Sequence, residues 1–193
     1  MGEAGGVETD GAGTLIAHAN SWINPNRNAG SKAEVEAMLL DTMGARKVIW
    51  APGITGADIT DYHIDALTRF VKPGQVLIQM GDVVDARDPW SVAAFETHGI
   101  LAATTDTSSE KLDLVLLPEP YDIRVDSADF VASYVNYYVC NGAVISAEFG
   151  DAEADEQARA TLAGLVLSRI RSAPSARLGH LTFEGQGAFS SQC

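Results

Sequence analysis

The chain has 193 residues, of which 46% are hydrophobic, and its 26 acidic and 13 basic residues give a net charge of −13 at pH 7. This content suffices for a sizeable core in one domain or a small pair of domains. The charge disfavours nucleic acid, which is bound through clustered Lys and Arg, and suits either a small cationic partner or a plain solvated surface. We expect a cytoplasmic protein without a membrane partner, because the two cysteines fit no zinc or disulfide pattern, no apolar run approaches the ~18 residues of a membrane span, and the start resembles no leader.

The first predicted elements are a strand, a helix and a second strand. Residues 13–23, "GTLIAHANSWI", are strand-like and follow a glycine turn at "DGAG". Residues 31–45, "SKAEVEAMLLDTMGA", predict a helix in which Ser31 is the N-cap and Glu34 completes a capping box. The short apolar run "KVIWAP" that follows predicts a buried strand that a proline ends.

The same order of elements recurs in a second round. "HIDALTRFV" and "QVLIQM" predict two strands joined by a turn at "KPG", and "LDLVLLPEP" predicts the closing strand. Between them, residues 88–104 predict a helix with Asp88 as N-cap and Pro89 in the first turn, where its missing N–H costs nothing.

A third round lacks its last element. "SYVNYYVC" and "AVISAEF" predict a hairpin around Asn141-Gly142, and residues 151–165 predict a helix with an acidic start. After Leu165 the pattern is lost, so no closing strand is predicted. A repeated strand, turn, strand, helix, strand unit, with turn glycines at Gly11, Gly74 and Gly142, predicts α/β modules around a centre, each burying a face against its neighbour.

One polar run raises a question of function. In "DITDYHIDALTRF", Asp61, His63 and Asp65 alternate, and in an extended segment they would share one face. The run is then either the lip of an active site or a solvated strand end. Together with Asp58, these residues also allow a divalent-metal site, although a single histidine gives that alternative little support.

Several phrases in register resemble one family. The stretches "EAGGVETDGAGTLIAHANSWINPNRN", "DITDYHIDALTRFVKPG", "PEP", "SYVNYYVCNGAVISAEFGD" and "ADEQARATLAGL" resemble the agmatine deiminase and bacterial-type peptidylarginine deiminase family. The resemblance implies an α/β fold, the pentein, an α/β propeller of five ββαβ modules of which about three are present here. It also implies hydrolysis of a guanidinium to a ureido group with release of ammonia, most often agmatine to N-carbamoylputrescine in putrescine and polyamine synthesis. No metal or organic cofactor is implied.

The resemblance assigns roles to individual residues. His63 falls on the family's general acid and base, and Asp65 on its guanidinium-binding aspartate. Glu3 matches a substrate-pocket glutamate, and Asp61 is expected to bind substrate beside them. The family's glycine after that glutamate is Ala4 here, which suggests an altered backbone approach.

Two further positions leave alternatives open. Tyr62 stands where the family usually has glycine, and its phenol either narrows the pocket, stacks on a guanidinium or faces solvent. Asn136 matches a recurrent family asparagine, for which a buried hydrogen-bonding role is expected rather than a catalytic one.

The family's nucleophilic cysteine has no counterpart in the sequence. Cys193 is terminal and lacks the family's glycine-rich phrase, and Cys140 is interpreted as a small buried hydrophobe. We therefore expect a partial deiminase domain over residues 1–165 and a divergent, poorly ordered tail over 166–193, following a late start and a frame change near Gly164. The alternative is a non-catalytic remnant that binds a guanidinium compound or self-associates through open sheet edges as a homo-oligomer.

Overall fold

The computed structural model describes residues 2–56, 58–125, 127, 130–140, 143–167 and 177–182. In each of the three sheets that these residues form, a hairpin of two antiparallel strands is extended by a third, parallel strand. The first sheet holds β1 (Val7–Thr9), β2 (Thr14–His18) and β3 (Lys47–Ala51). The second holds β4 (Thr68–Lys72), β5 (Gln75–Gln79) and β6 (Asp113–Leu117). The third holds β7 (Tyr138–Cys140), β8 (Ala143–Glu148) and β9 (Arg177–Thr182).

A helix connects the second and third strands of each sheet, as parallel pairing requires. These helices are α2 (Lys32–Met43), α3 (Pro89–Ala103) and α4 (Ala152–Leu162), and α4 continues as a π-helical turn over Ala163–Leu167. The predicted caps are confirmed. Ser31 and Glu34 form a capping box, and the Asp88 carboxylate accepts from the backbone N–H groups of Trp90 and Ser91. A short helix, α1 (Ala19–Trp22), ends what was predicted as one long strand.

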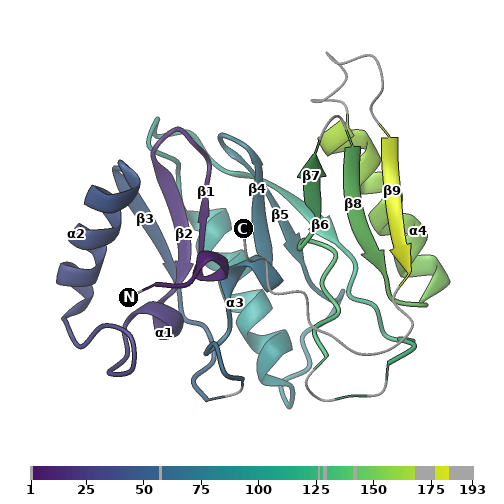
Figure 1. Ribbon diagram of the computed structural model, residues 1–193, viewed down its shortest axis with the longest axis horizontal. Coiled ribbons are helices and arrows are strands. Elements are labelled where there is room, and N and C mark those ends of the chain that lie inside the picture. Colours follow the sequence, from purple (N-terminus) through teal and green to yellow (C-terminus); the bar gives the residue numbers. More distant parts are fainter. Residues whose placement is uncertain are drawn as a thin grey trace.

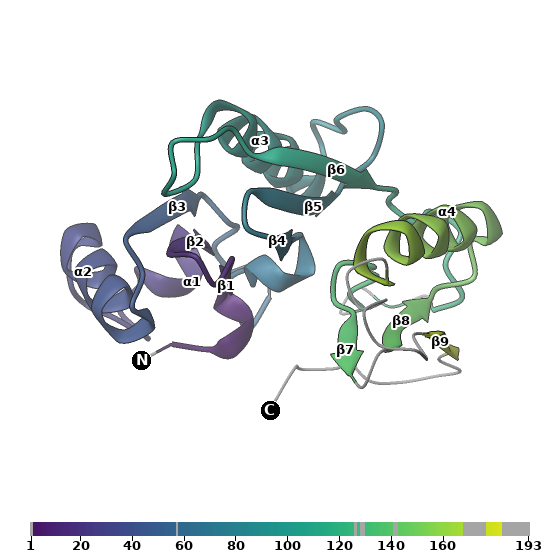
Figure 2. The same ribbon diagram turned by 90° about the horizontal axis from the view of Figure 1, so that it is seen from above.

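The three modules follow one another around an arc. Figure 2 shows the first strand of each module, β1, β4 and β7, toward the inside of this arc, with α2, α3 and α4 outside. Figure 1 shows β1 and β4 side by side at the middle of the molecule. The described part thus has the modular α/β architecture that the repeat predicted.

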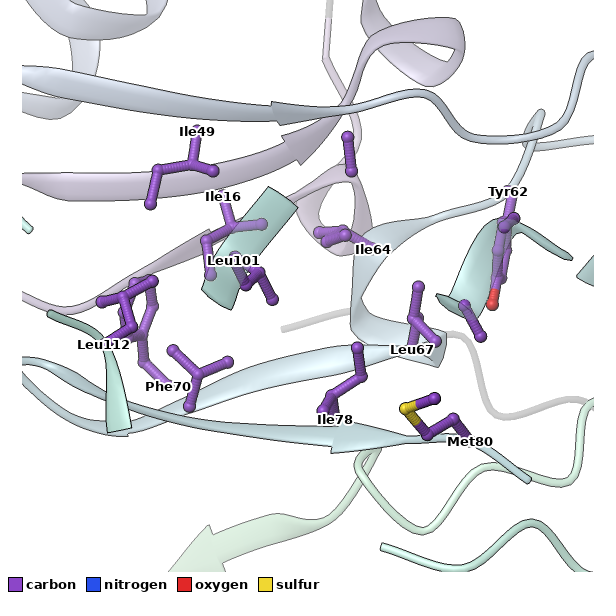
Figure 3. Packing of buried hydrophobic residues seen from close by; sticks show 14 residues of the cluster. Ile16, Ile49, Tyr62, Ile64, Leu67, Phe70, Ile78, Met80, Leu101 and Leu112 are labelled. Atoms are coloured by element: carbon purple, nitrogen blue, oxygen red, sulfur yellow. The ribbon is translucent and has the colours of Figure 1, made fainter. Parts of the chain in front are cut away.

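Neighbouring modules share their hydrophobic cores. The middle strand β2 directs Leu15 and Ala17 toward α2, and Ile16 toward the second module. The middle strand β5 divides in the same way, because Val76 and Ile78 pack with the first module and Leu77 with the third. Figure 3 shows the first shared cluster, in which Ile16 and Ile49 of one sheet meet Phe70 and Ile78 of the next. The expectation that each module buries a face against its neighbour is confirmed.

The expected absence of a closing strand in the third module is wrong. β9 pairs in parallel with β8 from Ala143↔Arg177 to Glu148↔Thr182, and so completes the third ββαβ unit. The Ser- and Arg-rich composition of this segment concealed the strand. The division of the chain at residue 165 stays a prediction, because residues 168–176 and 183–193 lie outside the described residues. In the described part, no helix is long and apolar enough to cross a membrane.

Candidate functional site

His63 immediately precedes a short 3-10 turn, Ile64–Ala66, that contains Asp65 and leads into β4. Ile64 and Leu67 lie three residues apart, face the same way in such a turn, and are both buried in the shared core. Their burial leaves His63 and Asp65 on the other side, next to Gly5. A Cβ atom placed on Gly5 would lie 2.7 Å from His63 Nδ1 and 2.6 Å from Asp65 Oδ2. The imidazole and the carboxylate therefore converge on one point of the backbone.

The extended geometry expected for Asp61, His63 and Asp65 is wrong. Asp61 and Tyr62 have φ values of 55° and 70°, in the left-handed region that side chains with a Cβ rarely adopt. The Asp58 carboxylate stabilises this turn, because its Oδ1 accepts from the backbone N–H groups of Thr60 at 2.6 Å and Tyr62 at 3.2 Å. The turn separates Asp61 from the side shared by His63 and Asp65.

The Tyr62 side chain does not face solvent, so that alternative is wrong, while its narrowing of the pocket and its stacking on a guanidinium stay predictions. Its side chain is buried, with its ring edge-on to Trp90 and tilted against the imidazole of His18. His18 Nδ1 donates a hydrogen bond of 2.7 Å to the Tyr62 carbonyl. This contact fixes the backbone immediately before His63.

Glu3 reaches the same point from the N-terminal segment. The 3-10 turn Ala4–Gly6 precedes β1 just as Ile64–Ala66 precedes β4, and Trp22 Nε1 anchors it with a 2.6 Å hydrogen bond to the Gly6 carbonyl. Glu3 Oε2 accepts a hydrogen bond from His63 Nε2. Ala4 is exposed, so the close backbone approach is made at Gly5.

An arginine that sequence reasoning did not select completes the cluster. The Arg27 guanidinium contacts Glu3 Oε1 at 3.2 Å and Asp61 Oδ2 at 2.9 Å. Burial alone would raise the pKa of Glu3, but hydrogen bonds from Arg27 and His63 outweigh it and hold that pKa below its usual value. The only sequence signal was the phrase "NPNR", in which Asn24 Oδ1 accepts from the backbone N–H groups of Asn26 and Arg27 and so forms the turn that presents the arginine.

The aspartates proposed as metal ligands have other partners. Asp61 Oδ1 accepts from the Gly56 N–H at 2.8 Å and its Oδ2 pairs with Arg27, while Asp58 holds the turn. Among the residues that the structure describes, no group of three or more His, Cys, Asp and Glu side chains is arranged to hold a metal ion. The arrangement instead joins the Glu3 carboxylate to the His63 imidazole and to the Arg27 guanidinium.

The remaining sequence assignments fare differently. Cys140 is only partly buried in β7, and Asn136 is exposed, so the buried roles expected for both are wrong. Cys193 lies outside the described residues. One shallow hollow of about 400 Å³ lies at the loop before α3, near Gly53 and Pro89. A second, of about 420 Å³, lies on the outer face of α2. Neither hollow is lined by His63 or Asp65.

Fold and site together define a class of protein. It is built from repeated ββαβ modules, and its polar site is assembled from equivalent turns before the first strands of two neighbouring modules. The family of Porphyromonas-type peptidyl-arginine deiminases matches residues 1–178, and the chain belongs to this family. The match continues past Gly164, which argues against a change of reading frame at that residue.

Individual relatives agree with this membership. The agmatine deiminase of Medicago truncatula is 34% identical over 176 residues, covering 81% of this chain and 46% of that protein. The agmatine deiminase of Pseudomonas fluorescens is 30% identical and is covered over 49% of its length. The structure of agmatine deiminase from Enterococcus faecalis superposes with a TM-score of 0.78 over 92% of this chain and 51% of that chain, at 24% identity, and supports the pentein fold. The chain spans about half the length of these relatives.

Gly5 provides a direct test of the site. We expect Gly5→Ala to push the His63 and Asp65 side chains apart, because its methyl group would fall within 2.7 Å of both. The displaced atoms belong to the His63 ring and the Asp65 carboxyl group, so we expect stability to fall by about 1–3 kcal/mol while the His63 NMR signals move. Gly99→Ala in α3 is the matched control, because nothing lies within 4 Å of its new Cβ. Unchanged His63 signals in Gly5→Ala would contradict the described packing.

Proposed function

We propose that this chain carries the guanidinium-binding and proton-transfer part of a guanidine-group hydrolase, with agmatine as the leading substrate and arginine or peptidyl-arginine after it. The observation that carries the proposal is the convergence of His63 Nδ1 and Asp65 Oδ2 on Gly5, with Glu3 on the other imidazole nitrogen. Two carboxylates beside an imidazole suit a flat cation with several N–H donors.

The residues have distinct parts in the proposed reaction. Asp65 and Glu3 accept hydrogen bonds from the guanidinium nitrogens and orient the central carbon for attack. A cysteine thiolate attacks this carbon, and the C–N bond breaks as His63 gives a proton to the departing ammonia. His63 then takes a proton from water, the water oxygen bonds to the central carbon, and the C–S bond breaks, which releases the ureido product and returns the thiolate. The nucleophilic thiolate is not assigned to a residue of this chain, since Cys140 belongs to the third sheet and His63 precedes the second.

The structure favours a different role for Asp61 from the one that the sequence suggested. Both of its oxygens have protein partners, Gly56 N–H and Arg27, and its side chain is 17% exposed. Asp61 is therefore proposed to hold Arg27, and Asp65 and Glu3 remain the residues proposed to bind substrate.

Binding is tested by calorimetric titration of the purified chain with agmatine. We expect Asp65→Asn to weaken agmatine binding about 10- to 100-fold, because a hydrogen bond to a charged group contributes about 1.5–3 kcal/mol. Asp41→Asn, at an exposed position in α2, removes the same charge away from the site and should bind like the original chain. Equal affinity of the Asp65 variant and the original chain would exclude the proposed role.

Turnover is tested separately from binding. Colorimetric detection of ureido product, compared with a His63→Ala control, distinguishes an active hydrolase from a chain that only binds a guanidinium. Product above the control supports hydrolysis. Agmatine binding without product supports the non-catalytic alternative and keeps the binding half of the proposal.

A further inference from the structure

We propose that Arg27 is a positioning residue whose guanidinium aims the Glu3 carboxylate at His63. Arg27 lies between two segments that are distant in sequence, 24 residues from Glu3 and 34 residues from Asp61. The inference rests on the proposed function only in treating His63 as the proton-transfer residue.

The contact with Glu3 uses two nitrogens along one edge of the guanidinium. Arg27 Nε donates to Glu3 Oε1 at 3.3 Å and Nη2 donates to Oε2 at 3.4 Å, so the planar groups face each other as a fork. Glu3 Oε2 is also the atom that accepts from His63 Nε2. The orientation that Arg27 imposes on the carboxylate is therefore the orientation in which Glu3 meets the imidazole.

The other end of the guanidinium is fixed to the loop before His63. Nη1 donates to Asp61 Oδ2 at 2.9 Å and Nη2 donates to the Ile59 carbonyl at 3.2 Å. Asp61 is itself held by the Gly56 N–H. Only 11% of the Arg27 side chain is exposed, so its contact with Asp61 is a buried, fixed anchor and not a solvent-exposed ion pair.

Glu3 needs such a support because it is the most exposed member of the cluster. Its side chain is 44% exposed, compared with 19% for His63. A glutamate with this exposure would otherwise sample several rotamers in water. Lysine could not replace the arginine, since a single ammonium group cannot present the fork to Glu3 and reach Asp61 at the same time.

The test is an NMR measurement of the His63 ring in the purified chain, with its signals identified by their loss in His63→Gln. Glu3→Gln defines the shift that accompanies loss of the carboxylate contact. We expect Arg27→Lys, which keeps the charge, to produce at least half of that shift. The matched control is Arg46→Lys. Arg46 donates to the Ala12 carbonyl at 2.8 Å and to Thr107 Oγ1 at 3.3 Å, in the same module but away from the site, and its variant should leave the His63 signals in place.

A second variant covers the case in which Arg27→Lys fails to fold. Asp61→Asn removes the charge that anchors Arg27 and retains a residue type that tolerates the left-handed backbone. It should move the His63 signals in the same direction as Arg27→Lys. Signals that stay in place in both variants while Glu3→Gln moves them would overturn the proposal, as would a Glu3→Gln variant without any shift. No ligand is needed, so a chain that binds no agmatine still tests the role of Arg27.

Discussion

Lowering the pH from 7 to 4 should cost this protein about 3 kcal/mol of stability through His18 alone. His18 is the last residue of β2 and is fully buried beneath Tyr62. Burial is the main reason that its pKa falls from 6.5 to about 4, and the charge of His63 lowers it further, against the raising effects of the Tyr62 carbonyl and Asp58. In the described part of the chain its Nε2 has no hydrogen-bond partner, so nothing there compensates a second proton.

The direction follows from proton linkage. Between pH 6.5 and about 4 the unfolded chain holds a proton on His18 that the folded chain does not, so folding becomes less favourable as the pH falls. This contribution to stability is complete above pH 6.5 and is lost by about pH 4. The measurement is the free energy of urea unfolding at pH 7, 5.5 and 4.

A matched pair of variants isolates the contribution of His18. In His18→Asn, the amide nitrogen can take the place of Nδ1 and donate to the Tyr62 carbonyl, but it does not titrate. This variant should lose about 3 kcal/mol less than the original chain between pH 7 and 4. His98→Asn, in α3, controls for removal of a histidine elsewhere. If His18→Asn shows the same pH dependence as the original chain, the described burial of His18 does not govern acid stability.

The fold was largely predictable because its signals are local. The caps at Ser31 and Asp88 and the turns at Gly11 and Gly74 are set by neighbouring residues, and both glycines have the positive φ that such turns require. Strand lengths were overestimated where tertiary contacts determine the local backbone conformation. The segment that begins at His63 looked like one strand, but burial of Ile64 and Leu67 in the shared core winds its first part into a 3-10 turn.

The sequence predicted which residues lie together in the candidate site, but not the geometry that brings them together. His63, Asp65 and Glu3 do come together, although the alternation argument that linked His63 and Asp65 to Asp61 was wrong. The left-handed turn depends on hydrogen bonds to Asp58, which a strand pattern does not reveal. Arg27 was missed because its partners are 24 and 34 residues away, beyond the reach of any local pattern.

Glu8 should lower the free energy of unfolding at alkaline pH. It lies in β1 with its side chain only 16% exposed, and the nearest cation, Arg69 Nε, is 4.0 Å away. Arg69 is engaged elsewhere, since its guanidinium lies 4.5 Å over the Tyr137 ring and donates to the Tyr137 carbonyl. Burial chiefly, with the charge of Asp65, raises the pKa of Glu8 from 4.5 to about 7 in spite of Arg69.

The sign is opposite to that for His18. Between pH 4.5 and about 7 the folded chain holds a proton on Glu8 that the unfolded chain has lost, so stability falls as the pH rises, by up to about 3 kcal/mol above pH 7. Glu8→Gln keeps the shape of the protonated acid and should raise the free energy of unfolding by that amount at pH 8 and by almost nothing at pH 4. Glu96→Gln, an exposed glutamate in α3, should change little at either pH. A Glu8→Gln variant no more stable than the original chain at pH 8 would mean that the carboxylate is solvated or fully paired.

If the gain appears, ionisation of Glu8 near neutral pH adds a negative charge beside Asp65, and agmatine should bind more tightly at pH 8 than at pH 6 in the original chain but not in the variant.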